Sequence, residues 1–391
     1  MNAPRIISLG CRMNIAESEQ MRAMLAGEQN LVVVNSCAVT GEALSQTRKA
    51  IRRARRDHPA ARLVVTGCAA EIDRAAIGAM DEVDGLVANA AKLDPRTWNV
   101  SVEAPPVAPA RTRAFIAVQN GCDHACTFCI IPQGRGVSRS LPITQVLREV
   151  EVHCAAEAKE VVLTGVDLTS WGQDMPDTPR LGALVGAILT AFPALPRLRL
   201  SSVDGIEIDD SLFDLLAHEP RVMPHLHLSL QHGADLILKR MKRRHLRADA
   251  VELVARLTAL RPDIAVGADL IAGFPTETEA HHADNLAIID ELGIVHAHVF
   301  PFSPRPGTPA ARMPQVPRDV VKARSADLRA RAAAHRADWL ASLVGETLTV
   351  LAERDGTGYA PSYARVALPP GTAAGTLVDV TVREVREGLL V

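Results

Sequence analysis

The chain has 391 residues, which is enough for two or three domains with separate cores. Hydrophobic residues make up 48% and charged residues 23%, a composition that excludes a disordered chain. Lys and Arg number 43 against 45 Asp and Glu, so the formal net charge of -2 does not by itself indicate a nucleic-acid partner. No signal peptide and no apolar run of about 18 residues is present, and we therefore expect a cytoplasmic protein without membrane contact.

Residues 1–103 alternate between short apolar runs and helix-like segments, which predicts a mainly parallel sheet covered by helices. Strands are expected at 5–9, 31–34 and 63–65, and helices at 17–25, 44–56 and 69–80. A cysteine follows each strand: Cys11, Cys37 and Cys68. Open α/β sheets place ligand-binding groups at the carboxyl ends of their strands, so three separated thiols are expected to converge on one edge.

Residues 102–111 are rich in proline and alanine and are interpreted as a linker. Beyond it, strands and helix-like segments alternate again, which predicts a full or partial β/α barrel. The strands are expected at 114–120, 160–166, 197–203, 225–231, 264–274 and 296–302. Thr276 and Glu279 predict a capping box at the start of one helix.

After a long helix expected at 318–343, the pattern changes to short strand candidates separated by glycine and proline turns. These candidates lie at 347–354, 363–368 and 377–385 and predict a small β-barrel. The expected domains are therefore residues 1–103, 112–343 and 344–391.

Three of the seven cysteines, Cys122, Cys126 and Cys129, lie in one Cys-x3-Cys-x2-Cys loop directly after a barrel strand, where barrels keep their active-site loops. In a reducing compartment such thiols serve as metal ligands rather than disulfides. Three thiolates on a cubane [4Fe-4S] cluster leave one iron open to a small molecule. A zinc site is the alternative, but structural zinc usually takes four protein ligands. Cys154 lies on the apolar face of an expected helix and is interpreted as a core residue.

The cysteine spacing, with Phe128 before the last cysteine, resembles the signature loop of radical S-adenosylmethionine (SAM) enzymes. Further segments resemble methylthiotransferases along nearly the whole chain: LGCRMN, NSCAVT, TGCAA, CTFCIIPQGRGVSRS, LHLSLQ, GADLIAGFPTET and VFPFSPRPGTPA. The resemblance implies an α/β protein with an N-terminal parallel α/β domain, a radical SAM partial (β/α) barrel and a small C-terminal all-β, TRAM-like, RNA-binding barrel.

The resemblance also implies two [4Fe-4S] clusters and SAM as cofactors. Cys122, Cys126 and Cys129 would hold the cluster that cleaves SAM reductively, and Cys11, Cys37 and Cys68 would hold a second cluster that carries the sulfur to be inserted. A second SAM would supply the methyl group.

Other residues near the expected barrel mouth are candidates for contact with SAM or substrate. They are Phe128, Gly165, Gln231, Asp269 and Arg139. The guanidinium groups of Arg135 and Arg139 are candidates for contact with the SAM carboxylate or an RNA phosphate, and the alternative for both is a salt bridge in a solvated loop. His232 departs from the small hydroxyl residue expected in the family after LSLQ. Two basic runs, 239–245 and 48–56, are candidates for phosphate contact, although the second is equally explained as the solvated face of a helix.

Within the family, the segments AVTGEALSQTRKAIRRARR, LKRMKRRH and GYAPSYARV most resemble the enzyme that modifies N6-threonylcarbamoyladenosine in tRNA. This implies position 37 of the anticodon loop as target and a 2-methylthio derivative as product. The alternatives are N6-isopentenyladenosine in tRNA, a ribosomal protein and, outside the class, a non-catalytic iron-sulfur electron carrier or RNA-binding regulator. We expect a reductant such as flavodoxin or ferredoxin; the residues do not identify the sulfur donor.

Overall fold

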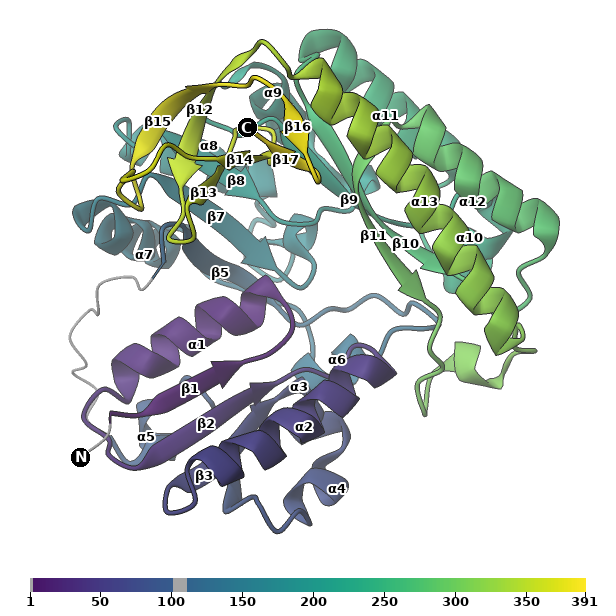
Figure 1. The fold of residues 1–391 in the computed structure, drawn as a ribbon. Helices are drawn as coiled ribbons and strands as arrows, with labels where there is room; N and C mark the ends of the chain where they lie inside the picture. Colours follow the sequence, from purple (N-terminus) through teal and green to yellow (C-terminus); the bar gives the residue numbers. More distant parts are fainter. Residues whose placement is uncertain (1–2, 101–110) are drawn as a thin grey trace.

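The computed structural model describes residues 3–100 and 111–391, so the expected linker lies outside the described residues except for Arg111. Figure 1 shows three successive parts: an α/β layer in purple, a larger set of strands and helices in teal and green, and a small sheet in yellow. Among the described helices, none combines the length and the apolar character that a membrane span requires.

The N-terminal sheet is parallel, with its strands in the order in which they occur along the chain. Its strands are β1 (Arg5–Ser8), β2 (Leu31–Ser36), β3 (Arg62–Gly67) and β4 (Gly85–Leu86). Its helices are α1 (Arg12–Met24), α2 (Gly41–Asp57), α3 (Cys68–Ile72), α4 (Arg74–Gly78) and α5 (Pro95–Trp98). The three predicted strands are confirmed. The helix expected at 69–80 is divided, because the chain leaves helical geometry at Asp73 (φ −124°, ψ 38°), whose carboxylate pairs with Arg48 of α2.

The central part is an open barrel of six parallel strands, formed by two three-stranded groups. The first group is β5 (Ala114–Asn120), β7 (Glu160–Gly165) and β8 (Arg197–Leu200); the second is β9 (His225–Gln231), β10 (Ala265–Ala272) and β11 (Ile294–Pro301). The groups meet through parallel bridges between Leu198 and Val222 and between Val203 and Leu228. A two-residue strand, β6 (Arg139–Ser140), runs antiparallel to β5. The predicted partial barrel is therefore confirmed.

Helices cover the outside of this barrel. They are α7 (Ile143–Ala155), α8 (Leu181–Ala191), α9 (Asp210–His218), α10 (Asp235–Met241), α11 (Arg247–Leu260) and α12 (Glu279–Glu291). All of them except α10 share one hydrophobic core with the barrel strands, whereas α10 packs in a smaller cluster around Phe274. Shorter turns are α6 (Ile131–Arg135), η1 (Leu168–Ser170), η2 (Gly205–Glu207) and η3 (Pro309–Arg312). Cys154 of α7 packs against the core as expected.

The predicted capping box at Thr276 is wrong. Helix α12 starts two residues later, with Thr278 as its N-cap and His281 as the reciprocal partner. The reason is Glu277, which turns inward and accepts hydrogen bonds from the backbone N–H groups of Gly273 (2.8 Å) and Phe274 (3.1 Å). Thr276 consequently adopts a positive φ of 69° and cannot begin the helix.

The long helix α13 (Arg318–Ser342) leads into a six-stranded, mainly antiparallel sheet. Its strands are β12 (Thr347–Ala352), β13 (Thr357–Tyr359), β14 (Arg365–Ala367), β15 (Leu377–Thr381), β16 (Val385–Arg386) and β17 (Leu389–Leu390). Arg113, just before β5, binds Glu353 (2.9 Å) and the Tyr363 hydroxyl (2.7 Å), and Arg199 donates to the Pro361 carbonyl (3.0 Å). The small sheet therefore packs against the amino ends of the barrel strands and leaves the carboxyl ends free.

Candidate functional site

The loop that carries Cys122, Cys126 and Cys129 starts at the carboxyl end of β5. Gly121 makes the turn into it with a φ of 76°, and a Cβ at this position would lie 1.9 Å from the Val137 carbonyl oxygen. Only glycine fits such a conformation and such a contact. The structure thus places the cysteine loop at the open mouth of the barrel, as the sequence predicts.

The three sulfur atoms of this loop lie close together and each receives a hydrogen bond. The donors are the backbone N–H of His124 to Cys122 (3.4 Å), the backbone N–H of Ile131 to Cys129 (3.4 Å) and the Arg243 guanidinium to Cys126 (3.7 Å). Burial, with the negative charges of Asp167, Cys129 and Cys126, raises the pKa of the Cys122 thiol to about 12. Such thiols deprotonate when a cationic metal centre binds them, and hydrogen bonds to sulfur tune an iron-sulfur cluster.

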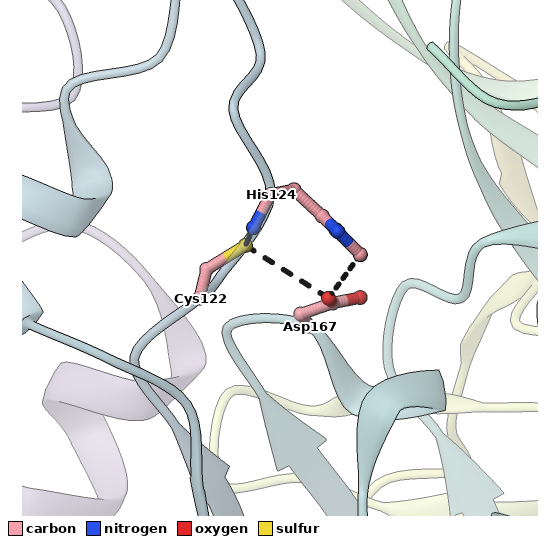
Figure 2. Close-up of side chains that lie close together, drawn as sticks. All are labelled: Cys122, His124 and Asp167. Carbon is pink, nitrogen blue, oxygen red and sulfur yellow. Dashed lines mark hydrogen bonds and ion pairs between the residues drawn. The ribbon is translucent and has the colours of Figure 1, made fainter. Parts of the chain in front are cut away.

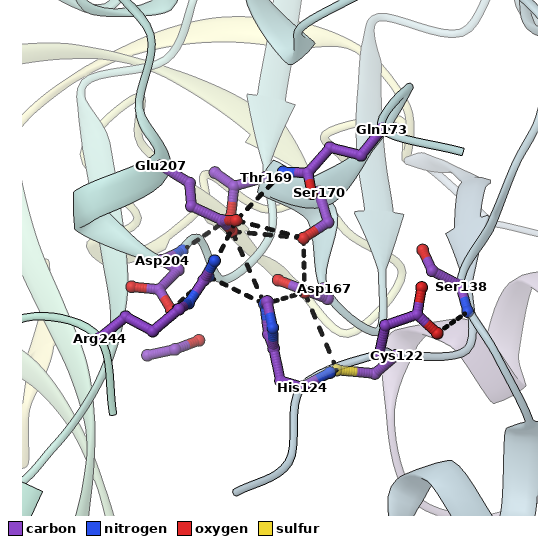
Figure 3. Close-up of polar contacts among 12 residues, drawn as sticks. Cys122, His124, Ser138, Asp167, Thr169, Ser170, Gln173, Asp204, Glu207 and Arg244 are labelled. Atoms are coloured by element: carbon purple, nitrogen blue, oxygen red, sulfur yellow. Dashed lines mark hydrogen bonds and ion pairs between the residues drawn. The ribbon is translucent and has the colours of Figure 1, made fainter. Parts of the chain in front are cut away.

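A polar cluster lies beside this loop and was not predicted from the sequence. Asp167 stands between the Cys122 sulfur (3.8 Å) and the His124 imidazole (2.6 Å), as Figure 2 shows. Figure 3 shows how the cluster extends to Glu207, which pairs with Arg244 at 2.8 Å. The His124 imidazole N–H donates to the Asp167 carboxylate, and this bond, together with the Glu207 carboxylate nearby, raises the pKa of His124 to about 10, so its imidazole is cationic at neutral pH.

The members of this polar cluster come from several loops at the carboxyl ends of the strands. Asp167 follows β7, Glu207 follows β8 in η2, and Arg244 follows α10. Only the position of these residues could have indicated the cluster from the sequence, because they follow the strands at the end where parallel barrels keep their functional side chains. Cys122, His124 and Asp167 could hold a single metal ion by distance alone, but that use would compete with Cys122 in the three-cysteine group.

Asp269 lies on the inner face of β10 and joins two histidines from neighbouring strands. The imidazoles of His227 on β9 and His298 on β11 each lie 3.1 Å from the same Asp269 oxygen. These bonds hold the pKa of Asp269 well below its usual range despite its burial. His298 is 59% exposed, and Phe300 is also exposed farther along β11. Among the described strands β11 is an edge, so the exposed rings lie where the barrel is open.

The other candidate residues differ in how free they are to bind a ligand. Phe128 packs edge-to-face on Phe274 with ring centroids 6.4 Å apart and anchors the cysteine loop. A Cβ at Gly165 would lie 3.0 Å from the Gln119 side-chain oxygen, which accepts a hydrogen bond from the Asp167 backbone N–H. Gly165 therefore makes room for a protein contact that holds Asp167 in place.

Gln231 and Arg139 make no side-chain hydrogen bond with any described residue, and both remain available. Gln231 ends β9 with a positive φ of 73°, and Arg139 is exposed on β6. His232, next to Gln231, is fully buried; its imidazole bonds Glu277 (3.3 Å) and the Ala234 N–H (3.0 Å). The unusual residue after LSLQ thus serves an internal contact.

The cysteines of the N-terminal part converge at the carboxyl edge of its sheet. Cys11 caps α1 after β1, Cys37 follows β2, and Cys68 begins α3 after β3. A Cβ at Gly10 would lie 2.6 Å from the Cys37 sulfur, which shows how closely the first two loops meet. Burial first, and then the neighbouring Cys11 and Cys68 thiols, raise the pKa of Cys37. The expected convergence is therefore present.

A buried charge network connects this second cysteine group with the barrel. Glu17 of α1 accepts from Lys92 at 2.6 Å and from Arg135 of α6 at 2.9 Å, and all three side chains are at most 2% exposed. Arg135 also donates to Asn14 (2.6 Å) and Asn120 (2.8 Å). The expectation that Arg135 meets SAM or an RNA phosphate is therefore wrong, because its guanidinium is saturated inside the protein.

The same network leaves one positive charge in excess beside the thiols. Burial raises the pKa of the Cys68 thiol, and the charges of Arg135 and Lys92 oppose this increase without cancelling it. An anionic group at the three cysteines would balance this excess. The residues present thus fit an iron-sulfur cluster with thiolate ligands.

Ion pairs within the protein neutralise part of the first basic run and most of the second. In run 239–245, Arg243 pairs with Asp204 (2.8 Å) and His245 is buried, whereas Lys239 and Lys242 are exposed. In run 48–56, ion pairs take up most of the charge: Arg48 with Asp73, Arg52 with Glu82, Arg53 with Asp57 and Arg55 with Asp84. The first run therefore offers more free cations near the barrel mouth.

A cluster of histidine and aromatic rings lies at the amino ends of β9 and β11 and extends to the C-terminal sheet. The His296 ring lies 5.3 Å from His225 and 5.1 Å from Trp339, measured between ring centroids. Its Nε2–H donates to the Ser362 carbonyl (3.1 Å), and its Nδ1 accepts from Arg336 (2.9 Å). Burial, together with the Arg336 charge, lowers the pKa of His296 to about 3. His296 is therefore neutral in the folded protein.

Because buried His296 is neutral, we expect the folded protein to lose stability in acid. The folded pKa of His296 lies below the unfolded value of 6.5, so its contribution to stability is complete above pH 6.5 and is lost as pH falls towards 3. At pH 5 the expected loss is about 1 to 2 kcal/mol. Urea unfolding at pH 7 and pH 5 should show a smaller pH effect in His296→Gln than in the unchanged chain. His218→Gln, at an exposed histidine of α9, controls for loss of an imidazole; equal pH effects in all three proteins would contradict the prediction.

Two family models match this chain. The Radical SAM superfamily matches residues 116–287, and a family described as uncharacterized protein family UPF0004 matches residues 4–88. The matched ranges contain the Cys122 loop and the three N-terminal cysteines respectively. The two cysteine groups thus belong to two separately recognised families.

Curated relatives extend the similarity to nearly the full chain. The threonylcarbamoyladenosine tRNA methylthiotransferase MtaB of Rickettsia prowazekii is 41% identical over 98% of this chain and 96% of its own length. The tRNA-2-methylthio-N(6)-dimethylallyladenosine synthase of Erythrobacter litoralis is 33% identical over 97% of this chain and 94% of its own length. Among solved structures, the radical SAM methyltransferase TsrM from Kitasatospora setae has a TM-score of 0.52 at 16% identity, covering 75% of this chain and 68% of that one. That likeness shows a shared fold.

Proposed function

This chain belongs to the radical SAM methylthiotransferase family, and on that premise we propose that it converts N6-threonylcarbamoyladenosine at position 37 of tRNA into the 2-methylthio derivative. The observation that carries the proposal is the presence of two three-cysteine groups joined through Glu17 and Arg135. The choice of base is supported by several relatives that are named threonylcarbamoyladenosine tRNA methylthiotransferases.

Two [4Fe-4S] clusters and SAM are the cofactors of this reaction. Cys122, Cys126 and Cys129 would hold one cluster together with SAM, and the N-terminal cysteines would hold the other. The bound cofactors supply the radical and the sulfur that replace the hydrogen at adenine C2, a substitution that no side-chain acid or base could perform. The Cys122 loop, Glu17 and Arg135 keep the two groups at a fixed separation.

The chain's own residues bind and orient the reactants. Gln231 and Arg139 have no side-chain partner among the described residues and are the best candidates for contact with SAM or substrate. The pair of Asp167 and cationic His124 would hold the Cys122 loop against the β7 end of the barrel. Asp269 fixes His298 at the open edge, where an imidazole could stack on a base.

The proposed partner is a tRNA whose target base leaves the stacked loop, because C2 of a stacked adenine is inaccessible. Exposed Lys239 and Lys242 could contact phosphates, and the TRAM-like residues 344–391 would bind another part of the tRNA. In this proposal, residues 1–103 and 112–343 form the other two domains. A cytoplasmic location and a flavodoxin or ferredoxin as reductant complete the proposal.

The test uses cluster-loaded protein under anaerobic conditions, with dithionite, SAM and two otherwise matched tRNAs. One carries N6-threonylcarbamoyladenosine and the other N6-isopentenyladenosine, both without the methylthio group. Mass spectrometry of the digested tRNA should show the 2-methylthio product from the first only, together with 5′-deoxyadenosine. Product from the second tRNA only would transfer the assignment to the isopentenyl enzyme. The absence of both methylthio products and of 5′-deoxyadenosine would contradict the enzyme class.

A further inference from the structure

Arg12 is a half-buried arginine that pairs with no carboxylate among the described residues. Its guanidinium donates a hydrogen bond to the Tyr363 hydroxyl at 3.1 Å and lies over the same ring, 5.5 Å from the centroid. A hydroxyl group does not neutralise a guanidinium, and charges that are partly removed from water are normally paired. Arg12 therefore keeps N–H donors for an anionic group that the described residues do not supply.

The carboxylates around Tyr363 are already paired with other arginines. Glu353 accepts from Arg113 at 2.9 Å, and the same arginine donates to the Tyr363 hydroxyl at 2.7 Å. Glu160 accepts from Arg199 at 2.8 Å, and that guanidinium lies 4.6 Å from the Tyr363 ring centroid. Three arginines thus gather at one tyrosine with two carboxylates between them. The remaining positive charge would be balanced by an anionic ligand.

Helix α1 directs Arg12 towards the interior of the open barrel. In Figure 1 this helix lies between the N-terminal sheet and the barrel strands. Its apolar contacts with the inner faces of β5 and β7 involve Ile15, Ala16, Phe115 and Val162. Neighbouring residues of both strands point the other way, into the core under the outer helices. On the far side, the Tyr363 ring stacks on His225 of β9 at 5.0 Å between centroids, so Arg12 lies between the two strand groups.

The reacting base brings its N6 substituent close to this arginine. Arg12 directly follows Cys11, which is exposed, and the proposed reaction places adenine C2 beside the N-terminal cysteine group. In adenine, C2 and C6 are both bonded to N1, so the N6 substituent begins next to the edge that reacts. A threonylcarbamoyl group ends in a carboxylate, whereas an isopentenyl group is an uncharged hydrocarbon. A guanidinium binds a carboxylate through parallel hydrogen bonds, but beside a hydrocarbon it would lose water without gaining a partner.

We propose that Arg12 binds the carboxylate of the threonylcarbamoyl group and thereby selects this base over N6-isopentenyladenosine. The inference rests on the proposed function, because it assigns one contact to the substrate of that reaction. The Tyr363 hydroxyl holds the guanidinium inside the barrel, and the remaining N–H groups donate to the carboxylate. No bond is made or broken at Arg12, so its role is to determine specificity.

The experiment measures the binding of two anticodon stem-loops to cluster-loaded full-length protein under anaerobic conditions. One carries N6-threonylcarbamoyladenosine at position 37, and the other carries the methyl ester of the same group, which removes the negative charge. The unchanged chain should bind the acid about 10- to 100-fold more tightly than the ester, the range expected for charge-assisted hydrogen bonds in a partly desolvated site. Arg12→Gln should lose this preference, whereas Arg12→Lys, which keeps the charge, should retain part of it.

The ester stem-loop controls for folding and cluster content within each variant, because the two ligands share every other contact. Arg22→Gln is the matched control, since it removes a positive charge from the last turn of the same helix and should keep the full preference. No preference in the unchanged chain would overturn the proposal, as would a preference that persists in Arg12→Gln. Equal weakening of both stem-loops by Arg12→Gln would also overturn it and indicate a phosphate contact.

The tRNA test of the proposed function separates the two possible failures. Should the unchanged chain show a preference that depends on Arg12 but form no methylthio product, the proposed function falls and the carboxylate contact stands. Should methylthio product form from the threonylcarbamoyl tRNA while the preference does not depend on Arg12, the proposed function stands and the assignment of Arg12 falls.

Discussion

Glu17→Gln should lower the free energy of unfolding by about 3 to 5 kcal/mol, because it leaves Lys92 and Arg135 as uncompensated buried cations. The Glu17 carboxylate accepts from Lys92 at 2.6 Å and from the two terminal nitrogens of Arg135 at 2.9 and 3.1 Å. Lys92 and Glu17 belong to the N-terminal part, whereas Arg135 ends α6 directly after the Cys122 loop. The substitution should therefore loosen the contact between the two cysteine groups.

Urea unfolding of the protein before cluster loading measures the change in stability. Glu19→Gln is the control on the same helix, since Glu19 pairs with the half-exposed Arg111 and such pairs contribute about 0 to 1 kcal/mol. In a cluster-loaded Glu17→Gln protein, SAM cleavage should persist while methylthio product falls. Unfolding curves of Glu17→Gln that coincide with those of the unchanged chain would show that the network does not hold the two parts together.

The fold was predictable because its signal is local. Each barrel strand is a short apolar or alternating segment, and β5 and β9 coincide with the predicted segments at 114–120 and 225–231. The rule that parallel strands present ligands at their carboxyl ends then placed all six cysteines correctly at two sheet edges. Strands of two residues, such as β4 and β16, carry too little pattern to be recognised.

The rest of the site depends on contacts between distant segments, which periodicity does not encode. Glu17 and Arg135 are 118 residues apart, and the sequence alone suggested for Arg135 a ligand contact or a salt bridge in a solvated loop, not a buried ion pair with Glu17. The bond between His227 and Asp269 spans 42 residues and is visible only once β9 and β10 are adjacent. The wrong prediction of a capping box at Thr276 has the same origin, because the tertiary hydrogen bonds of Glu277 outweigh the local capping preference.

Cys126→Ala should reduce SAM cleavage by at least about 1000-fold, because the three thiols of the loop act as one unit and losing one removes the function of all. The iron content should fall by about half, since the N-terminal group does not use Cys126. Production of 5′-deoxyadenosine and bound iron are the measurements. Cys154→Ala is the matched control, because this thiol packs against the barrel core and should leave both quantities unchanged. The complementary Cys68→Ala should retain SAM cleavage but lose methylthio product. SAM cleavage by Cys126→Ala at the rate of the unchanged chain would exclude the Cys122 loop as the site of radical generation.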